Sequence, residues 1–173
     1  VAVDLRTGSG QVHRVAVTGP AGRDAGLEGR RERLPDNGEA DRSALVQVLH
    51  GGDPVLQSER DAQNEAGTTT APGSPLAVAH RDFLRTVDAT SAITVPLGSY
   101  QQITGALTVV RTDPAHPFDA ADLEVVSDIG RRVGLVIDNA RLFGRQRAVA
   151  EAMQHNLLAP LPQPGRLRLA ARY

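Results

Sequence analysis

The sequence predicts an α+β fold that ends in one long helix. Three observations predict it. Apolar residues alternate with a period of two in several short runs, as they do in strands. In other segments they recur every three or four residues, as they do on one face of a helix. No proline interrupts the helical pattern between Asp119 and Pro160.

The N-terminal segment is predicted to be a β-hairpin. Val1, Val3 and Leu5 alternate with other residues, and after the glycine-rich turn RTGSGQ the alternation continues at Val15 and Val17. Because the chain opens inside a strand, we expect the domain to be truncated at its N-terminus.

The next part of the chain is less regular. We expect a short helix over residues 24–34, and Asp41 can cap a further helix. The apolar face of that further helix consists of Ala44, Leu45, Val48 and Leu49. Residues 54–57 are a short strand candidate, and residues 58–73 have no periodicity and are expected to form a loop.

A helix and two strands are predicted next. Ser74 is a good helix start, since Pro75 is tolerated in the first turn. The apolar face of this helix consists of Leu76, Ala79, His80, Phe83 and Val87. Residues 91–98 and 103–111 follow as strands, and the second is apolar on both faces, which is typical of a central, covered strand.

The long helix begins after Asp119, a good N-cap residue. One apolar stripe, which could pack on a sheet, consists of Leu123, Val126, Gly130, Val133, Ile137 and Ala140. A second stripe repeats every seven residues and consists of Ile129, Val136, Phe143, Ala150 and Leu157. About forty helical residues would span about 60 Å. We therefore expect the second half to extend beyond the domain and to pair with a partner. The alternative is a break near Gly144, after which the chain folds back.

Composition excludes several classes of protein. A net charge of −1 argues against a nucleic-acid-binding protein. The absence of cysteine excludes disulfides, thiolate metal sites and a thioether-linked chromophore, and it favours a reducing cytoplasm. No apolar run reaches membrane-spanning length, and no leader sequence is recognisable.

The chain resembles a GAF domain in the order of these elements and in two segments. The segments are VPLGSYQQITGALTVVR at 95–111 and PFDAADLEVVSDIGRRVGLVIDNARLF at 117–143. The resemblance implies a cytoplasmic sensory module over residues 1–143. It also implies a PAS-like central antiparallel sheet flanked by helices.

The remaining segment, RAVAEAMQHNLLAPLPQPGRLRLAARY, is similar to the lead-in to bacterial metal-dependent Ser/Thr phosphatases of the stage II sporulation protein E type. The matching positions are Leu157, Leu158, Pro160, Pro162 and Ala170–Tyr173. This resemblance implies a signalling or linker helix at 144–159 and the start of a downstream phosphatase domain at 160–173. The metal-binding Asp residues of that family, with their Mn or Mg, would lie beyond residue 173. We therefore expect no enzyme activity and no cofactor in this fragment.

A cavity on one side of the sheet is expected to bind a small molecule. The residues expected to face it are Leu56, His80, Phe83, Thr94, Tyr100 and Thr108. His80 could ligate haem, touch a ligand or simply pack at the edge of the core. Cyclic-nucleotide-binding GAF domains carry a motif with a Lys, which this chain lacks altogether.

His155 raises a different possibility. HNLLAPL resembles the phosphoacceptor box of sensor histidine kinases, but Asn156 stands where an acid is expected and no second helix follows Pro160. The other histidines show no metal-ligand spacing.

The function that this sequence favours is a sensory and regulatory module. It would bind an unknown small molecule and control a C-terminal phosphatase through a dimerising helix, with no nucleic acid or membrane as partner. The signalling positions of that helix, through which a homodimer is expected, are Val136, Phe143, Ala150 and Leu157. The alternatives are a ligand-free dimerisation scaffold and the input domain of a sensor histidine kinase.

Overall fold

The computed structural model describes residues 1–19, 26–36, 43–58, 61, 74–99 and 102–157. Its elements are β1 (Ala2–Arg6), β2 (Gln11–Val17), β3 (Arg31–Arg33), α1 (Ala44–Leu49), β4 (Val55–Ser58), α3 (Pro75–Thr86), β5 (Ser91–Ser99), β6 (Gln102–Arg111) and α4 (Ala120–Leu157). The chain divides into two compact units, Val1–Asp138 and a second that begins at Asn139, and α4 contributes residues to both.

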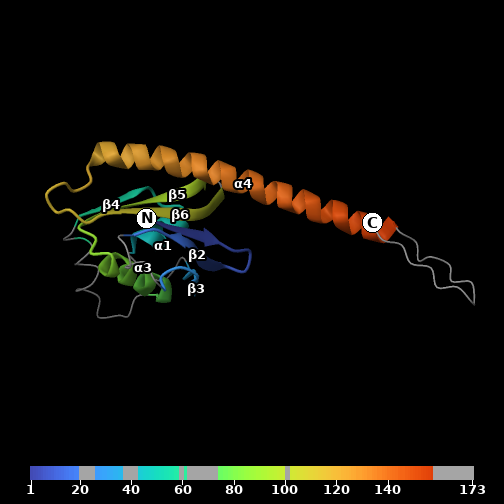
Figure 1. Cartoon of the computed structure of the whole chain (residues 1–173), viewed down its shortest axis with the longest axis horizontal. Coiled ribbons are helices and arrows are strands. Elements are labelled where there is room, and N and C mark those ends of the chain that lie inside the picture. The colour runs from blue at the N-terminus through green and yellow to red at the C-terminus, as the bar shows by residue number, and fades with distance from the viewer. Residues whose placement is uncertain (20–25, 37–42, 59–60, 62–73, 100–101, 158–173) are drawn as a thin grey trace, which may run out of the picture. The chain divides into compact units, whose positions relative to one another are not determined.

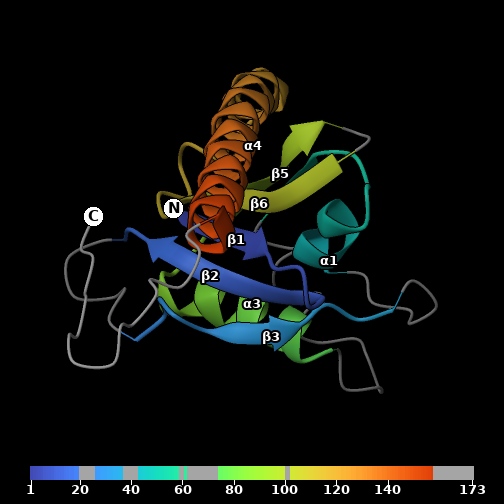
Figure 2. The same cartoon turned by 90° about the vertical axis from the view of Figure 1, so that its right-hand side faces the viewer.

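The described strands form one antiparallel sheet in the order β3-β2-β1-β6-β5-β4. In the first unit, α1 and α3 cover one face, called here the inner face, and the start of α4 covers the other, the outer face (Figure 1). Figure 2 shows the same layers from the side. The prediction of an α+β fold with a central antiparallel sheet between helices is confirmed.

Strands β5 and β6 are interior strands of the sheet, called here the central strands, and both of their faces are covered. Ile93 and Val95 pack with Val126 of α4 on the outer face, whereas Ala92 and Ala106 pack under the helices of the inner face. Residues 103–111 were predicted to be a central strand because they are apolar on both sides. The structure gives the reason, since helices cover both faces of the sheet at this strand.

Helix α3 forms where its start signal predicted. The Oγ of Ser74 accepts a hydrogen bond from the Ala77 N–H at 3.2 Å, and Pro75 stands in the first turn. The predicted apolar face of α3 is buried, and Phe83 is among the largest fully buried side chains. Burial of this face against the sheet is the main source of the helix's stability.

Helix α4 approaches β5 closely at two glycines. A Cβ at Gly134 would collide with the backbone of Gly98, and a Cβ at Gly130 would collide with Val95 and Pro96. Gly98 itself has φ +123° beside an irregularity in the register of β5 and β6. Backbone-to-backbone contact of this kind requires glycine.

This contact corrects the predicted sheet-facing stripe. Val126 and Gly130 are buried and Leu123 and Ile137 are half-buried, as predicted. Val133 and Ala140, in contrast, are exposed. Gly134 takes the buried place beside Val133, because only a residue without a side chain fits against Gly98.

The short helix expected over 24–34 is wrong where the structure describes it. Arg31–Arg33 form β3, which pairs with β2, and Gly26 and Gly29 adopt positive φ in the turn before it. The free edge of β2 outweighs the helical propensity of Arg and Glu. Asp41 and most of the loop at 58–73 lie outside the described residues, and Ser43 occupies the N-cap position of α1.

Helix α4 runs from Ala120 to Leu157 without a break at Gly144, so the continuous helix is confirmed and the fold-back alternative is wrong. In the second unit, every residue from Leu142 to Met153 is exposed.

Candidate functional site

Several polar and aromatic side chains are buried on the inner face of the sheet and on the face of α3 that covers it. The register places Asp4 opposite Arg14 and Thr94 opposite Thr108, with Ala2 of β1 opposite Thr108 on its other side. Together with two residues of α3 they form the inner-face cluster, which consists of Asp4, Arg14, His80, Phe83, Thr94 and Thr108.

A buried ion pair stands at one end of the cluster. Arg14 donates from Nε to Oδ1 of Asp4 at 3.0 Å and from Nη2 to Oδ2 at 3.1 Å, and both side chains are 3% exposed or less. The same guanidinium lies 4.9 Å from the centroid of the Phe83 ring, and its Nη1 donates to the Ala79 carbonyl at 3.4 Å. Arg14 therefore joins β1, β2 and α3 in one contact network.

Burial and charge set the protonation of the cluster. Burial raises the pKa of Asp4, against the opposing effect of Arg14. Burial, and to a smaller extent the positive charge of Arg14, lowers the pKa of His80 to about 3. His80 is consequently a neutral imidazole at physiological pH.

The His80 ring is fully buried, yet neither Nδ1 nor Nε2 has a hydrogen-bond partner among the described residues. The centroid of its ring lies 6.4 Å from that of the Phe83 ring. Buried polar atoms are nearly always hydrogen-bonded. A neutral imidazole has one hydrogen-bond donor and one acceptor. The unpartnered His80 ring is therefore suited to bind a group that supplies both an acceptor and a donor.

Two threonines on the central strands complete the cluster. The Oγ1 atoms of Thr94 and Thr108 lie 3.3 Å apart, within hydrogen-bond range but long for two hydroxyls. Both side chains are fully buried. Each hydroxyl keeps a further hydrogen-bonding direction for another polar group.

Four of the residues predicted to face a cavity are fully buried, and they form two pairs: His80 with Phe83 on α3, and Thr94 with Thr108 on β5 and β6. Leu56 does not join them. It pairs with Ile93, which packs against α4, so Leu56 lies on the outer face, where it is 36% exposed. Tyr100 lies outside the described residues.

Sequence reasoning missed Asp4 and Arg14. The sequence did contain a signal. Asp4 lies two residues after the buried Ala2 and Arg14 lies two residues after the buried Val12, so in a strand each charge lies on the same face as a buried apolar residue. A charge in the inward phase of a strand indicates a buried pair.

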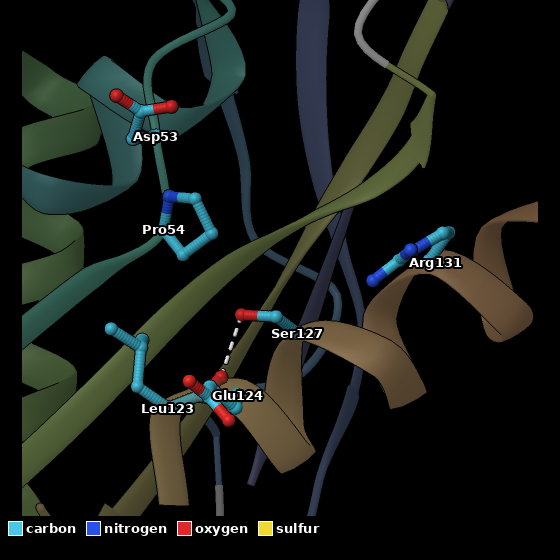
Figure 3. Close-up of a pocket in the computed structure, with 6 residues that line it drawn as sticks. All are labelled: Asp53, Pro54, Leu123, Glu124, Ser127 and Arg131. Atoms are coloured by element: carbon cyan, nitrogen blue, oxygen red, sulfur yellow. Dashed lines mark hydrogen bonds between the residues drawn. The ribbon is translucent and has the colours of Figure 1, made fainter. Parts of the chain in front are cut away.

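A second candidate is an open groove of about 420 Å³ on the α4 side of the sheet (Figure 3). Its lining residues are Asp53, Pro54, Leu123, Glu124, Ser127 and Arg131. Ser127 donates its hydroxyl to the Leu123 carbonyl at 2.6 Å, so that oxygen is not poised as a nucleophile. Mixed charges and openness make the groove less suited than the inner-face cluster to enclose a small molecule.

The end of β6 is clamped to the start of α4. Arg111 donates to Asp122 Oδ1 at 3.1 Å and to the Pro117 carbonyl at 3.1 Å, and its guanidinium lies 4.2 Å from the Phe118 ring centroid. The Ser91 Oγ accepts the Phe118 N–H at 3.0 Å. The start of α4 is therefore held by both central strands.

Among the residues that the structure describes, no group of three or more His, Asp or Glu side chains is placed to hold a metal ion. In the same part of the chain, no helix has the length and hydrophobicity that a membrane crossing requires.

Comparisons with known proteins agree with this architecture. The GAF domain of a two-component sensor histidine kinase from Bacillus halodurans is similar, with 19% identity over 83% of each chain and a TM-score of 0.56. The GAF domain/HD domain protein from Geobacter sulfurreducens is 15% identical, covers 82% of this chain and 80% of its own, and has a TM-score of 0.57.

The phycocyanobilin-bound GAF domain of a cyanobacterial phytochrome is 12% identical over 82% of this chain and 75% of its own, with a TM-score of 0.53. At these identities the likeness shows the fold alone. No curated protein matches the chain.

The sequence model of the GAF domain family matches residues 4–137, which include both central strands and the part of α4 that covers them. The chain therefore belongs to the GAF domain family, whose members are sensory and regulatory modules.

Proposed function

We propose that this chain is the sensory module of a bacterial signalling protein and that its inner-face cluster responds to a small molecule. The observation that carries the proposal is the His80 ring, fully buried with both nitrogens unpartnered among the described residues. The buried hydroxyls of Thr94 and Thr108 add hydrogen-bonding capacity on the same face of the sheet. One structurally similar GAF domain, that of the cyanobacterial phytochrome, holds phycocyanobilin.

The output of this module would be a metal-dependent Ser/Thr phosphatase domain in a cytoplasmic protein. This part rests on the resemblance of residues 147–173 to the lead-in of such phosphatases. The present chain would itself be non-catalytic, and Mn or Mg would belong to the phosphatase domain.

A homodimer through α4 would carry the signal. Val136 and Phe143 are 67% and 69% exposed, and Ala150 is exposed at the next heptad position. Side chains of this kind favour a partner helix. A ligand that prefers one arrangement of the inner-face cluster would shift the population of helix arrangements through β6 and Arg111.

Native mass spectrometry of the purified chain tests this function. A dimer that carries additional small-molecule mass, lost in a His80→Leu variant that still folds, is the expected result. A bare monomer would contradict both the ligand and the pairing.

A ligand-free dimerisation scaffold is the second candidate. The observation in its favour is that His80, Phe83, Thr94 and Thr108 are each 0% exposed, as in a filled core. In native mass spectrometry, a dimer without additional small-molecule mass would favour this candidate, provided that incubation of the purified chain with cell lysate adds no mass. The histidine kinase reading depends on His155, whose side chain lies outside those described.

A further inference from the structure

The groove beside α4 lies on the outer face of the sheet, apart from the inner-face cluster (Figure 3). One wall belongs to α4, with Leu123, Glu124, Ser127 and Arg131, and the other to the connection before β4, with Asp53 and Pro54. Its volume of about 420 Å³ falls within the range of ligand sites, roughly 300–1,000 Å³. Because the groove is open, it suits an extended molecule that lies along it.

Three charged side chains of the groove are available to a ligand. Among the residues that the structure describes, Asp53, Glu124 and Arg131 take part in no ion pair, and all three are exposed. Helix α4 does pair its charges where a spacing of four allows it, as Arg132 does with Asp128 at 2.7 Å. Glu124 and Arg131 are seven residues apart, which is too far for them to neutralise each other.

The spacing of the two charges on α4 sets the length of the ligand. The seven residues from Glu124 to Arg131 correspond to about 10 Å along the helix, at 1.5 Å per residue. They also make almost two full turns, so both side chains project from the same side of α4. An extended peptide of three residues spans about 10 Å. A single amino acid is too short to reach both charges.

The groove has a complementary group for each part of such a peptide. The Glu124 carboxylate suits an ammonium group, and the Arg131 guanidinium suits a carboxylate, which it can bind with two parallel hydrogen bonds. The Ser127 hydroxyl donates to the Leu123 carbonyl, so its oxygen can still accept a hydrogen bond from a peptide N–H. Pro54 and Leu123 add apolar surface for a side chain of the peptide.

We propose that this groove binds short peptides of about three residues with free ends, the amino end at Glu124 and the carboxyl end at Arg131. Asp53 on the facing wall gives the groove two carboxylates and one guanidinium. The amino end therefore contributes more to affinity than the carboxyl end does. This site is separate from the inner-face cluster, and the proposal does not rest on the proposed function.

Calorimetric titration of the full chain with the tripeptide Ala-Leu-Ala tests the proposal. We expect saturable binding of one peptide per chain. Acetylation of the amino end and amidation of the carboxyl end should each weaken binding by about tenfold or more, with the larger loss from acetylation. Free alanine, which cannot reach both charges, should bind more weakly by a similar factor.

Two variants assign each end of the peptide to its residue. Glu124→Gln should weaken binding of the uncapped peptide by about tenfold and leave binding of the acetylated peptide unchanged. Arg131→Gln should have the corresponding effect on the uncapped and amidated peptides. Both side chains are exposed, so neither change disturbs the fold. Arg147→Gln and Glu151→Gln, which alter an exposed pair outside the groove, are the matched controls and should bind as the wild type does.

Each other result overturns the proposal. Equal affinity for capped and uncapped peptides means that the groove does not recognise the ends, and equal affinity for free alanine refutes the spacing. An absence of saturable binding at millimolar peptide means that the three charges are only solvated.

His80→Leu separates this site from the proposed function. The variant should bind the tripeptide as the wild type does. Loss of tripeptide binding in His80→Leu would place the peptide at the inner-face cluster, which overturns the groove as the site and leaves the proposed function standing.

Discussion

At His80, a neutral imidazole is enclosed near a buried guanidinium, and the described residues hydrogen-bond neither of its nitrogens. Protonation of this ring would place a second cation beside Arg14 without solvent. The folded state therefore resists protonation far more strongly than the unfolded chain does. This difference makes the stability of the protein depend on pH in a known direction.

We expect acid to destabilise the protein through His80. Its pKa falls from 6.5 in the unfolded chain to about 3 in the fold, so below pH 6.5 the unfolded state binds more protons. The free energy of unfolding should fall by roughly 2 kcal/mol between neutral pH and pH about 5, and His80→Leu should abolish this part. Urea unfolding of both proteins at the two pH values measures it.

Val78→Ala, at an exposed residue of α3, provides the control, because it removes no ionisable group and should keep the wild-type dependence on pH. Asp4, whose pKa is raised in the fold, contributes in the opposite direction, but it does so in all three proteins and cancels in the comparison. An identical dependence in wild type and His80→Leu would refute the assignment.

At the scale of elements, the contact between α4 and β5 depends on two facing glycines. We expect Gly134→Ala to lower the free energy of unfolding by about 1–3 kcal/mol, because the new Cβ meets the backbone of Gly98 and the helix must shift. Gly144→Ala is the matched control. Its Cβ meets nothing within 4 Å, and alanine favours a helix by about 1 kcal/mol over glycine. If Gly134→Ala and Gly144→Ala change the thermal unfolding temperature equally, the proposed contact between α4 and β5 is contradicted.

The clamp at Arg111 gives the second prediction for an element. Arg111→Ala removes the contacts to Asp122, Pro117 and Phe118, so the first turns of α4 should exchange amide hydrogens several-fold faster. Arg85→Ala removes an exposed pair with Asp82 and should leave α4 unchanged. If exchange over residues 119–126 does not respond to the loss of Arg111, other contacts hold the start of α4.

At the scale of the whole molecule, the second unit lacks buried contacts of its own from Leu142 to Met153. Isolated helices of this length are marginal in water. We expect amide exchange in this segment to slow as protein concentration rises from micromolar toward millimolar, while β5 and β6 do not change. Phe143→Glu should remove the dependence on concentration, and Ala148→Glu should retain it. Exchange independent of concentration in the wild type would argue against pairing.

The sequence predicts the local features of this fold well, but it does not predict the features that depend on contacts between distant parts of the chain. The boundaries of α3, β5 and β6 follow from alternation and from the Ser74 cap, which are local signals. Strand β3 could not be found in this way, because Arg31–Arg33 become a strand only by pairing with β2. Leu56 was assigned to the wrong face for a similar reason: its phase depends on its register with Ile93.

The sequence by itself determined the GAF fold, the continuous helix Ala120–Leu157 and the buried face of α3, since periodicity and caps record which side chains must be buried. Only the tertiary structure decided that Asp4 and Arg14 pair beside His80 and that Gly134 seats α4 on Gly98. The physical reason is that such contacts join residues far apart in the chain. Strand register and backbone approach create them, and neither leaves a periodic trace in the sequence.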